Sequence, residues 1–99
     1  MKKNTMTPAQ ISKAQHRLVA LTKQITKVGP MMRGTIVTNG KKHRQAYLSL
    51  NKNKRTYLIY LGEKRVAVAQ GMLDNYKAML EIMEEMTVIN MGLLKNDAL

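Results

Sequence analysis

The residues with the clearest chemical meaning in this chain are cationic, and they gather in the stretch NGKKHRQAYLSLNKNKRTYLIYLG, residues 39–62. Lysine and arginine occupy both connections between its apolar segments, and no acidic residue interrupts them. Guanidinium and ammonium groups bind phosphate oxygens, while polar side chains between them can reach base edges. This stretch therefore predicts that the chain contacts a polyanion.

Charge is distributed unevenly along the chain, which has 17 Lys and Arg against 6 Asp and Glu and a net charge of +11. Residues 1–62 contain 13 of the basic residues and none of the acidic ones, whereas the last 37 residues contain 4 and 6. Ordinary solubilising surfaces intersperse the two signs. The separation favours a nucleic acid first and an anionic membrane second, with a solvated basic surface that has no partner as the alternative.

The candidate contacts divide by side-chain type. Basic side chains in and around the two connections are candidates for holding phosphates: Arg33, Lys41, Lys42, His43, Arg44, Lys52, Lys54 and Arg55. Side chains on one face of the intervening segment are candidates for touching bases: Gln45, Tyr47 and Ser49. For Tyr57 and Tyr60, packing within a sheet is the favoured role. For Tyr47, packing and nucleic-acid contact are equally expected.

No residue pattern predicts catalysis. His16 and His43 lie far apart and have no nearby carboxylate in the sequence. Glu81, Glu84 and Glu85 fall on the polar side of an expected helix, where solvated charge is the ordinary role. The sequence has no P-loop, no nucleophile elbow and no cysteine for a disulfide or a thiolate metal site. We therefore predict no catalytic residue, no metal and no cofactor.

A helix over residues 8–28 is predicted by its boundaries and its apolar spacing. Thr7, Pro8 and Gln10 have the pattern of a capping box with proline at the first helical position, and Gly29-Pro30 stops the helix. Apolar residues repeat at spacings of three and four along one side: Ile11, Ala14, Leu18, Leu21, Ile25 and Val28. This is the pattern of a helix that packs on another helix.

Three strands of an antiparallel sheet are predicted at residues 33–38, 45–50 and 55–61. Asn39-Gly40 and the NKNK run that follows the second strand are hairpin signals. Alternation assigns the second strand's residues to two faces: Ala46, Leu48 and Leu50 on one, Gln45, Tyr47 and Ser49 on the other. The third strand is apolar on both faces, which predicts that it is the central or best-covered strand.

A long helix is predicted over residues 63–94, about 45 Å at 1.5 Å per residue. Its apolar stripe is wider than a two-stranded seam needs, and the first helix, roughly 30 Å long, is too short to cover it. We expect the excess to bind a second copy or another protein through these residues: Met72, Leu73, Tyr76, Met79, Leu80, Met83 and Met86. Coverage of the stripe by the sheet is the alternative.

Together these elements predict an α+β fold in a single domain, residues 1–99, with the two helices packed together as a hairpin or coiled coil. The basic N-terminal segment MKKNTMTPAQ lacks the apolar core of a signal peptide. No apolar run approaches the roughly 18 residues of a membrane-spanning helix. The absence of cysteine fits a reducing compartment, so we expect a cytoplasmic protein.

Four segments carry a resemblance to known proteins: RGTIVT, AYLSL, YLIYLGEK and NYKAMLEIMEEMTVIN. Over about residues 29–94 they are similar to a family of small bacterial proteins often carried with transposons and other mobile elements. That family commonly has a cysteine cluster between its first two strands, where this chain has NGKKHRQ, so no metal knuckle is implied here. The sheet-then-helix order also resembles the arm-binding domains of tyrosine recombinases, as an analogy of architecture. The resemblance implies a bacterial, nucleoid-associated protein.

These observations lead to one expected function and three alternatives. The leading expectation is a non-enzymatic DNA-binding protein, an accessory factor of a mobile genetic element, because small sheets fit the major groove. RNA binding within a ribonucleoprotein, through phosphates, 2′-hydroxyls and loops, is the first alternative. A protein-docking inhibitor or assembly subunit is the second. Membrane binding is the weakest alternative and we expect no membrane partner, because the first helix has neither Trp nor Phe.

Overall fold

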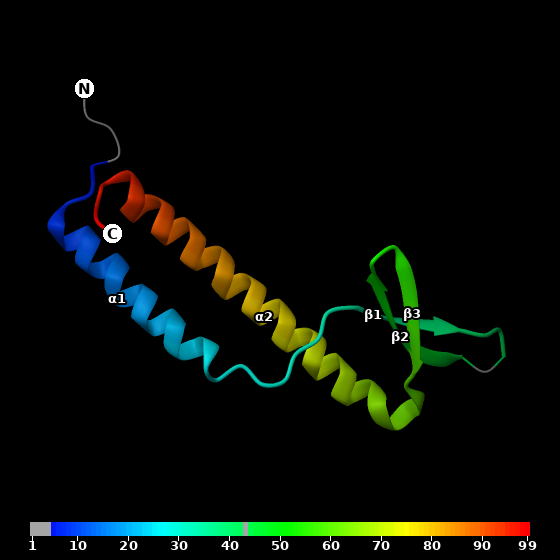
Figure 1. Cartoon of the computed structure of the whole chain (residues 1–99). Helices are drawn as coiled ribbons and strands as arrows, with labels where there is room; N and C mark the ends of the chain where they lie inside the picture. The colour runs from blue at the N-terminus through cyan, green and yellow to red at the C-terminus, as the bar shows by residue number, and fades with distance from the viewer. Residues whose placement is uncertain (1–4, 43) are drawn as a thin grey trace. The chain divides into compact units, whose positions relative to one another are not determined.

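The structure is a computed structural model that describes residues 5–42 and 44–99 (Figure 1). Its elements follow the predicted order and confirm the α+β arrangement of an N-terminal helix, a three-stranded antiparallel sheet and a long C-terminal helix. Their bounds are α1 Pro8–Ile25, β1 Thr35–Asn39, β2 Gln45–Lys52, β3 Arg55–Tyr60 and α2 Gly62–Lys95.

The described residues divide into two compact units. The helical unit comprises the described residues up to Val28 together with Met79–Leu99, and the sheet unit comprises Gly29–Ala78. Helix α2 runs through both, with its first part in the sheet unit and its last part in the helical unit. Each unit has its own buried residues and is described by itself.

Helix α1 begins as its sequence predicts. The side chain of Thr7 accepts a hydrogen bond from the Gln10 backbone N–H at 3.2 Å, and the Gln10 side chain accepts one from the Thr7 N–H at 2.9 Å. This capping box satisfies amide groups that the first helical turn cannot pair internally. Pro8 occupies the start of the helix, where its missing N–H costs nothing.

Helix α1 ends at Ile25, three residues before the predicted end. The Thr26 hydroxyl donates to the Lys23 carbonyl at 2.7 Å, and the Lys27 N–H donates to the Gln24 carbonyl at 3.0 Å. These tight contacts replace the last α-helical turn, because the chain must become extended before Pro30. The apolar spacing correctly predicted which side of the helix is buried. The spacing continues to Val28, however, which lies beyond this cap.

The helical unit is an antiparallel helix pair. Arg17 on α1 contacts Glu85 on α2, and the Met6 N–H donates to the Asn96 side chain at 2.9 Å. Met6 lies eleven residues before Arg17, and Asn96 lies eleven residues after Glu85. The two contacts therefore fit one antiparallel register. The most buried side chains of the unit are Leu21, Ile82 and Leu93.

The sheet has the order β1-β2-β3, so β2 is the central strand and β3 lies at an edge. The expectation that the third strand is central or best covered is therefore wrong. Every residue of β3 is exposed, including the large apolar side chains Tyr57, Leu58, Ile59 and Tyr60. Apolar character on both faces indicated burial, but β3 pairs on one side only, and the described chain leaves its side chains open.

The core of the sheet unit lies between one face of the sheet and the first part of α2. Leu48, Leu61, Ala69 and Leu73 are its buried members. Half-buried side chains pack against them: Met32, Ile36, Ala46 and Val66. In the register Ile36, Leu48 and Ile59 lie side by side across the three strands, so this is the face predicted to carry Ala46, Leu48 and Leu50. We call it the core face.

The segment that leads into β1 is held against α2. The Asn75 side chain donates to the Pro30 carbonyl at 2.7 Å, and the Met32 N–H donates to the Met72 carbonyl at 3.3 Å. Gly34 then has a φ of 144°, and a Cβ there would lie 2.9 Å from the Ser49 carbonyl oxygen. Glycine at this position lets the chain pass close to β2, and β1 starts one residue later.

A tight corner joins β3 to α2. The Leu61 N–H donates to the Ala46 carbonyl at 2.9 Å, and Gly62 follows with a φ of 66°. The Arg65 side chain donates to the Leu61 carbonyl at 3.0 Å and also to the Tyr60 carbonyl. Arg65 therefore has a structural role, because its guanidinium donates hydrogen bonds to backbone carbonyls at the corner.

Candidate nucleic-acid interface

The first cationic group lies in the loop between β1 and β2. Lys41, Lys42 and Arg44 are all exposed there, and His43, also a predicted contact, lies outside the described residues. Among the described residues, the three basic side chains have neither an ion pair nor a hydrogen bond to the protein. Their charges are available to an external anion.

The second cationic group surrounds the turn between β2 and β3. Lys52 and Arg55 are paired across the two strands, and Asn53 and Lys54 form a two-residue turn between them. Both turn residues have left-handed backbone angles, with φ of 52° and 64°. This is the geometry of a type I′ hairpin, whose twist matches that of the strands. Lys54 is therefore held at the tip of the hairpin in a conformation that lysine rarely adopts.

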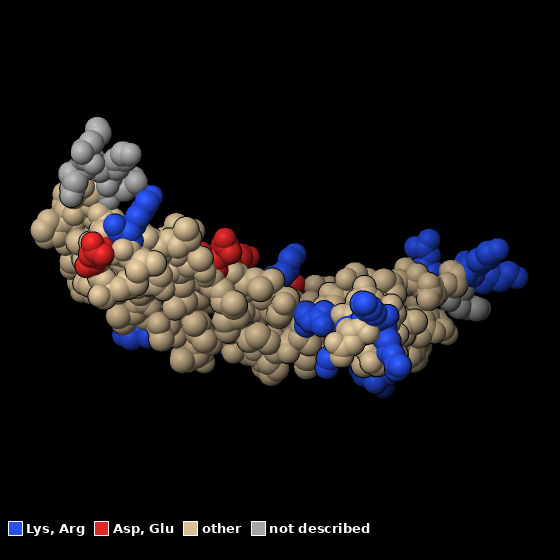
Figure 2. Space-filling model, turned by 45° about the horizontal axis from the view of Figure 1, so that its top comes forward, with Lys and Arg blue, Asp and Glu red and all other residues tan. Residues whose placement is uncertain are grey.

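The two groups lie at opposite ends of β2. Since β2 has eight residues, they are separated by about 24 Å along the strand at about 3.4 Å per residue. Figure 1 shows the two connections at different ends of the sheet, and Figure 2 shows Lys and Arg side chains around it. The sheet unit contains ten basic and two acidic residues, a net charge of +8, against +3 for the rest of the chain.

Between the two cationic groups lies the sheet face opposite the core face, which we call the outer face. It carries Gln45, Tyr47 and Ser49 from β2, as alternation predicted. The Tyr47 hydroxyl donates to the Gln45 side-chain oxygen at 3.1 Å. The Tyr47 ring meets the Tyr60 ring edge to face, with centroids 5.5 Å apart and planes inclined at 62°. These contacts order the polar atoms that the face presents.

Strand β3 adds two large side chains to the outer face that the predicted contact set omitted. Leu58 lies beside Ser49, and Tyr60 lies beside Tyr47. Leu58 and Tyr60 are 54% and 48% exposed, so about half of the surface of each residue is accessible to a partner. A small pocket of about 160 Å³ brings Tyr60 together with Arg44 and Gln45. The period-two pattern of β3 could have placed both on this face once the strand was recognised as an edge.

Arg33 differs from the other predicted phosphate contacts. One of its terminal nitrogens donates to the Asn51 carbonyl at 3.0 Å. The Asn51 side chain in turn accepts from the Thr56 hydroxyl at 2.7 Å. Arg33 is thus tied to the end of β2 near the second cationic group, with its side chain exposed. This contact holds the guanidinium in position and occupies part of its hydrogen-bonding capacity.

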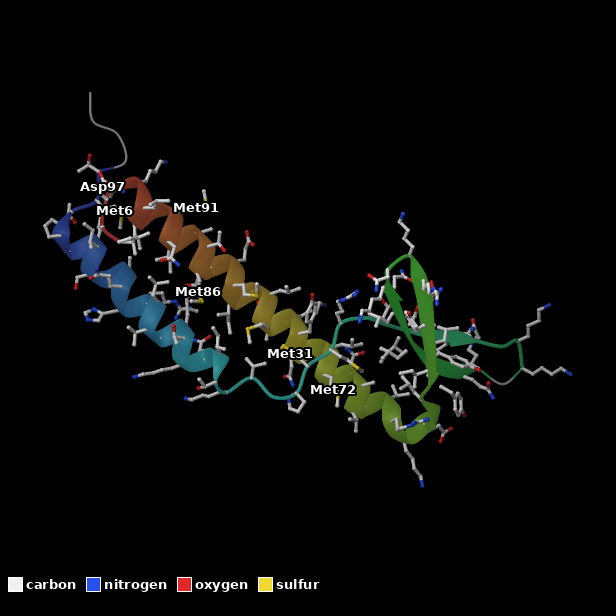
Figure 3. The ribbon with its side chains drawn as sticks, in the orientation of Figure 1. Met6, Met31, Met72, Met86, Met91 and Asp97 are labelled. Carbon is white, nitrogen blue, oxygen red and sulfur yellow. The ribbon has the colours of Figure 1, made fainter. Side chains whose placement is uncertain are left out.

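The residues predicted to bind a protein partner do not share one environment. Leu73 is buried in the core of the sheet unit, and Met72, Tyr76, Met79 and Met86 are half-buried. Leu80 and Met83 are 44% and 53% exposed. Figure 3 shows Met86 on the side of α2 that faces α1 and Met91 pointing away from it.

Comparison of the chain with protein-family models, with curated proteins and with solved structures gives no match. Within residues 5–42 and 44–99, no helix combines the length and apolarity needed to cross a membrane. In the same part of the chain, no three His, Cys, Asp or Glu side chains come together as a metal site would require.

Proposed function

We propose that this chain is a non-enzymatic DNA-binding protein that contacts the duplex through its sheet unit. The observation that carries the proposal is the pair of cationic groups at the two ends of β2, with an ordered polar and aromatic face between them. Lysine and arginine side chains on phosphates fix position, and side chains on a face read base edges. A polyanion explains both features with a single contact surface.

The geometry suggests how the sheet meets the duplex. The separation of about 24 Å between the cationic groups is roughly twice the ~12 Å width of the major groove. The strands therefore lie obliquely in the groove, with Lys41 and Lys42 on one phosphate backbone and Lys54, at the tip of the hairpin, on the other. In this orientation the outer face points at the base edges, where the Gln45 amide is suited to adenine.

The cellular role is proposed on separate grounds. The resemblance of RGTIVT, AYLSL, YLIYLGEK and NYKAMLEIMEEMTVIN to proteins carried with mobile elements supports an accessory role in recombination or transposition. Such a protein acts on the bacterial nucleoid in the cytoplasm. Its contribution would be to bind and position DNA, because the cationic groups offer phosphate contacts and no catalytic residue is proposed.

One observation favours a second candidate, the binding of RNA or single-stranded DNA. The outer face carries two tyrosines, and Tyr60 is 48% exposed. Aromatic side chains on a basic sheet can stack on unpaired bases. Duplex DNA stays the first proposal because Tyr47 and Tyr60 contact each other edge to face, which leaves less ring surface open to bases.

The test is a series of binding measurements with duplex DNA, single-stranded DNA and structured RNA at several salt concentrations. Changing Lys41, Lys42, Lys52 and Lys54 to Gln should weaken binding to all DNA sequences alike. It should also flatten the dependence of log affinity on log salt by about 0.9 for each lost duplex contact, or about 0.7 on a single strand.

The control removes three exposed charges elsewhere, Lys13, Lys23 and Lys27, each changed to Gln, and the change in slope is compared per removed charge. Arg17 is left intact because it is paired with Glu85. If the control flattens the salt dependence as much as the hairpin set does, the sheet is not the binding surface. If no nucleic acid binds at low salt, the exposed apolar side chains of β3 make a protein-docking subunit the better reading.

A further inference from the structure

The part of α2 in the helical unit has a second apolar row that the unit leaves uncovered. Leu80, Met83, Met91 and Leu94 are 44%, 53%, 63% and 65% exposed, and exposed Thr87 lies between them. At 3.6 residues per turn these five residues fall within about 80° around the helix and extend over about 21 Å. We call this row the open stripe. The buried residues Ile82 and Leu93 lie on a different side of the helix.

The residue types of the open stripe are arranged symmetrically about Thr87 along the helix. Leu80 and Leu94 lie seven residues on either side of Thr87, and Met83 and Met91 lie four residues on either side. When two such helices pack antiparallel and cross at Thr87, each leucine faces a leucine and each methionine faces a methionine. A two-fold symmetric interface requires this kind of self-complementarity, because the same patch serves on both copies.

The small residue at the centre suits a close crossing. Thr87 is the least bulky member of the stripe, and its hydroxyl donates to the Met83 carbonyl at 2.7 Å, so it needs no external partner. Gly92 lacks a side chain and leaves a shallow apolar hollow beside Met91 and Leu94. In the antiparallel arrangement Leu80 of the second copy faces this part of the helix.

Charges beside the stripe select the same direction. Glu81 and Lys95 are both exposed and lie on the same flank of the open stripe near its two ends. In an antiparallel pair Glu81 of each copy lies near Lys95 of the other. In a parallel pair Glu81 of one copy and Lys95 of the other lie about 21 Å apart along the helices, so neither charge gains a partner across the interface.

We propose that the open stripe is the interface of a homodimer, in which two copies of α2 pack antiparallel about a two-fold axis at Thr87. The interface differs from the set expected from spacing, because Leu73 and the half-buried methionines serve the chain's own packing. Only Leu80 and Met83 belong to both sets. The proposal concerns the helical unit and does not depend on nucleic-acid binding.

Crosslinking tests the geometry directly, because the natural sequence has no cysteine. The Thr87→Cys variant should crosslink to itself with a short bis-maleimide, since paired helices lie about 8–10 Å apart. The Leu80→Cys variant alone should not, because its two copies are about 21 Å apart along the helices. A mixture of the Leu80→Cys and Leu94→Cys variants should crosslink to each other. Crosslinking of Leu80→Cys to itself would instead show a parallel pair.

Sedimentation velocity tests the association itself. The wild-type chain should sediment as a dimer of the 11.2 kDa protein at micromolar concentration. The double variant Met83→Glu, Met91→Glu should have a dimer dissociation constant at least about tenfold higher than the wild type, because the dimer would bury its carboxylates. Val19→Glu is the matched control, since Val19 is an apolar residue on α1 that is 55% exposed and lies outside the stripe. A wild-type monomer at every accessible concentration overturns the proposal.

Discussion

Arg17 on α1 holds Glu85 on α2 through two parallel hydrogen bonds. Its Nε donates to Oε2 at 2.5 Å and its Nη2 donates to Oε1 at 2.9 Å. This is the only ion pair among the described residues, and it joins the two helices of the helical unit. The hydrogen bond from Arg17, together with the attraction of its charge, lowers the pKa of the Glu85 carboxyl from its ordinary 4.5, while burial opposes the shift.

This pairing predicts how stability depends on pH. Because the pKa of Glu85 is lower in the folded chain than in the unfolded chain, the pair stabilises the fold fully above about pH 5 and progressively less as the pH falls below 4.5. The melting temperature of the wild type should therefore fall more steeply between about pH 6 and about pH 3 than that of Glu85→Gln. The effect should be small, since both side chains are exposed.

The neighbouring Glu84 supplies the control for the pH measurement. It is exposed and has no basic partner within the described residues. Glu84→Gln should keep the steep acid limb of the wild type. If Glu84→Gln and Glu85→Gln flatten that limb equally, the acid sensitivity comes from net charge and the Arg17 contact is not its source.

Gly34 and Gly71 should respond in opposite directions to alanine. A Cβ at position 34 would lie 2.9 Å from the Ser49 carbonyl oxygen, and φ is 144°, so Gly34→Ala should lower the free energy of unfolding by about 1–3 kcal/mol. At Gly71, on an exposed part of α2, nothing lies within 4 Å of an added Cβ. Gly71→Ala should therefore stabilise by about 0.5–1 kcal/mol. Urea unfolding of both variants measures the difference.

Lys54 allows charge and hairpin stability to be separated at one position. Its φ of 64° is unfavourable for lysine, so Lys54→Gly should stabilise the sheet unit by up to about 1 kcal/mol. Lys54→Gln removes the same charge without that gain. Both should reduce the salt dependence of DNA binding by about 0.9 of a slope unit. Unequal slopes would mean that the rigidity of the hairpin, more than the charge of its tip, controls binding.

The two faces of the sheet should behave differently when aromatic residues are removed. Tyr47→Ala on the outer face should reduce discrimination between preferred and random duplex DNA by about 1–3 kcal/mol. Tyr57→Ala on the opposite face is the control, since Tyr57 is 46% exposed but lies on the core face, beside Leu50. Quantitative competition binding makes the comparison. A larger loss on single strands than on duplex would favour the second candidate function.

Local chemistry made several features of this protein predictable. The capping box of Thr7 and Gln10 needs only residues three apart, so the start of α1 could be predicted and is confirmed. The separation of Gln45, Tyr47 and Ser49 from Leu48 follows from the alternation of a strand and is also confirmed. Predicting where α1 ends was harder, because the cap at Thr26 depends on a hydroxyl contact within the last turn.

The burial of apolar residues could not be predicted in the same way. Leu80 and Met83 continue an apolar row with spacings of three and four residues, formed by Val66, Ala69, Leu73 and Tyr76. They are nevertheless exposed, while Ile82 is buried. The first part of α2 packs on the sheet and the last part on α1, and each partner selects the side of the helix that it covers. The spacing along one helix shows which rows of residues are apolar, but it does not show which row another element will bury.

The sequence by itself determined the elements, their order, the two faces of β2 and the concentration of positive charge in the sheet unit. These depend on neighbouring residues and on composition. Only the tertiary structure decided that β3 is an edge strand, that Tyr60 and Leu58 join the outer face, and that Arg33 and Arg65 are engaged by backbone carbonyls. Those facts depend on which distant segments pair, and a strand's own residues do not specify how many neighbours it will have.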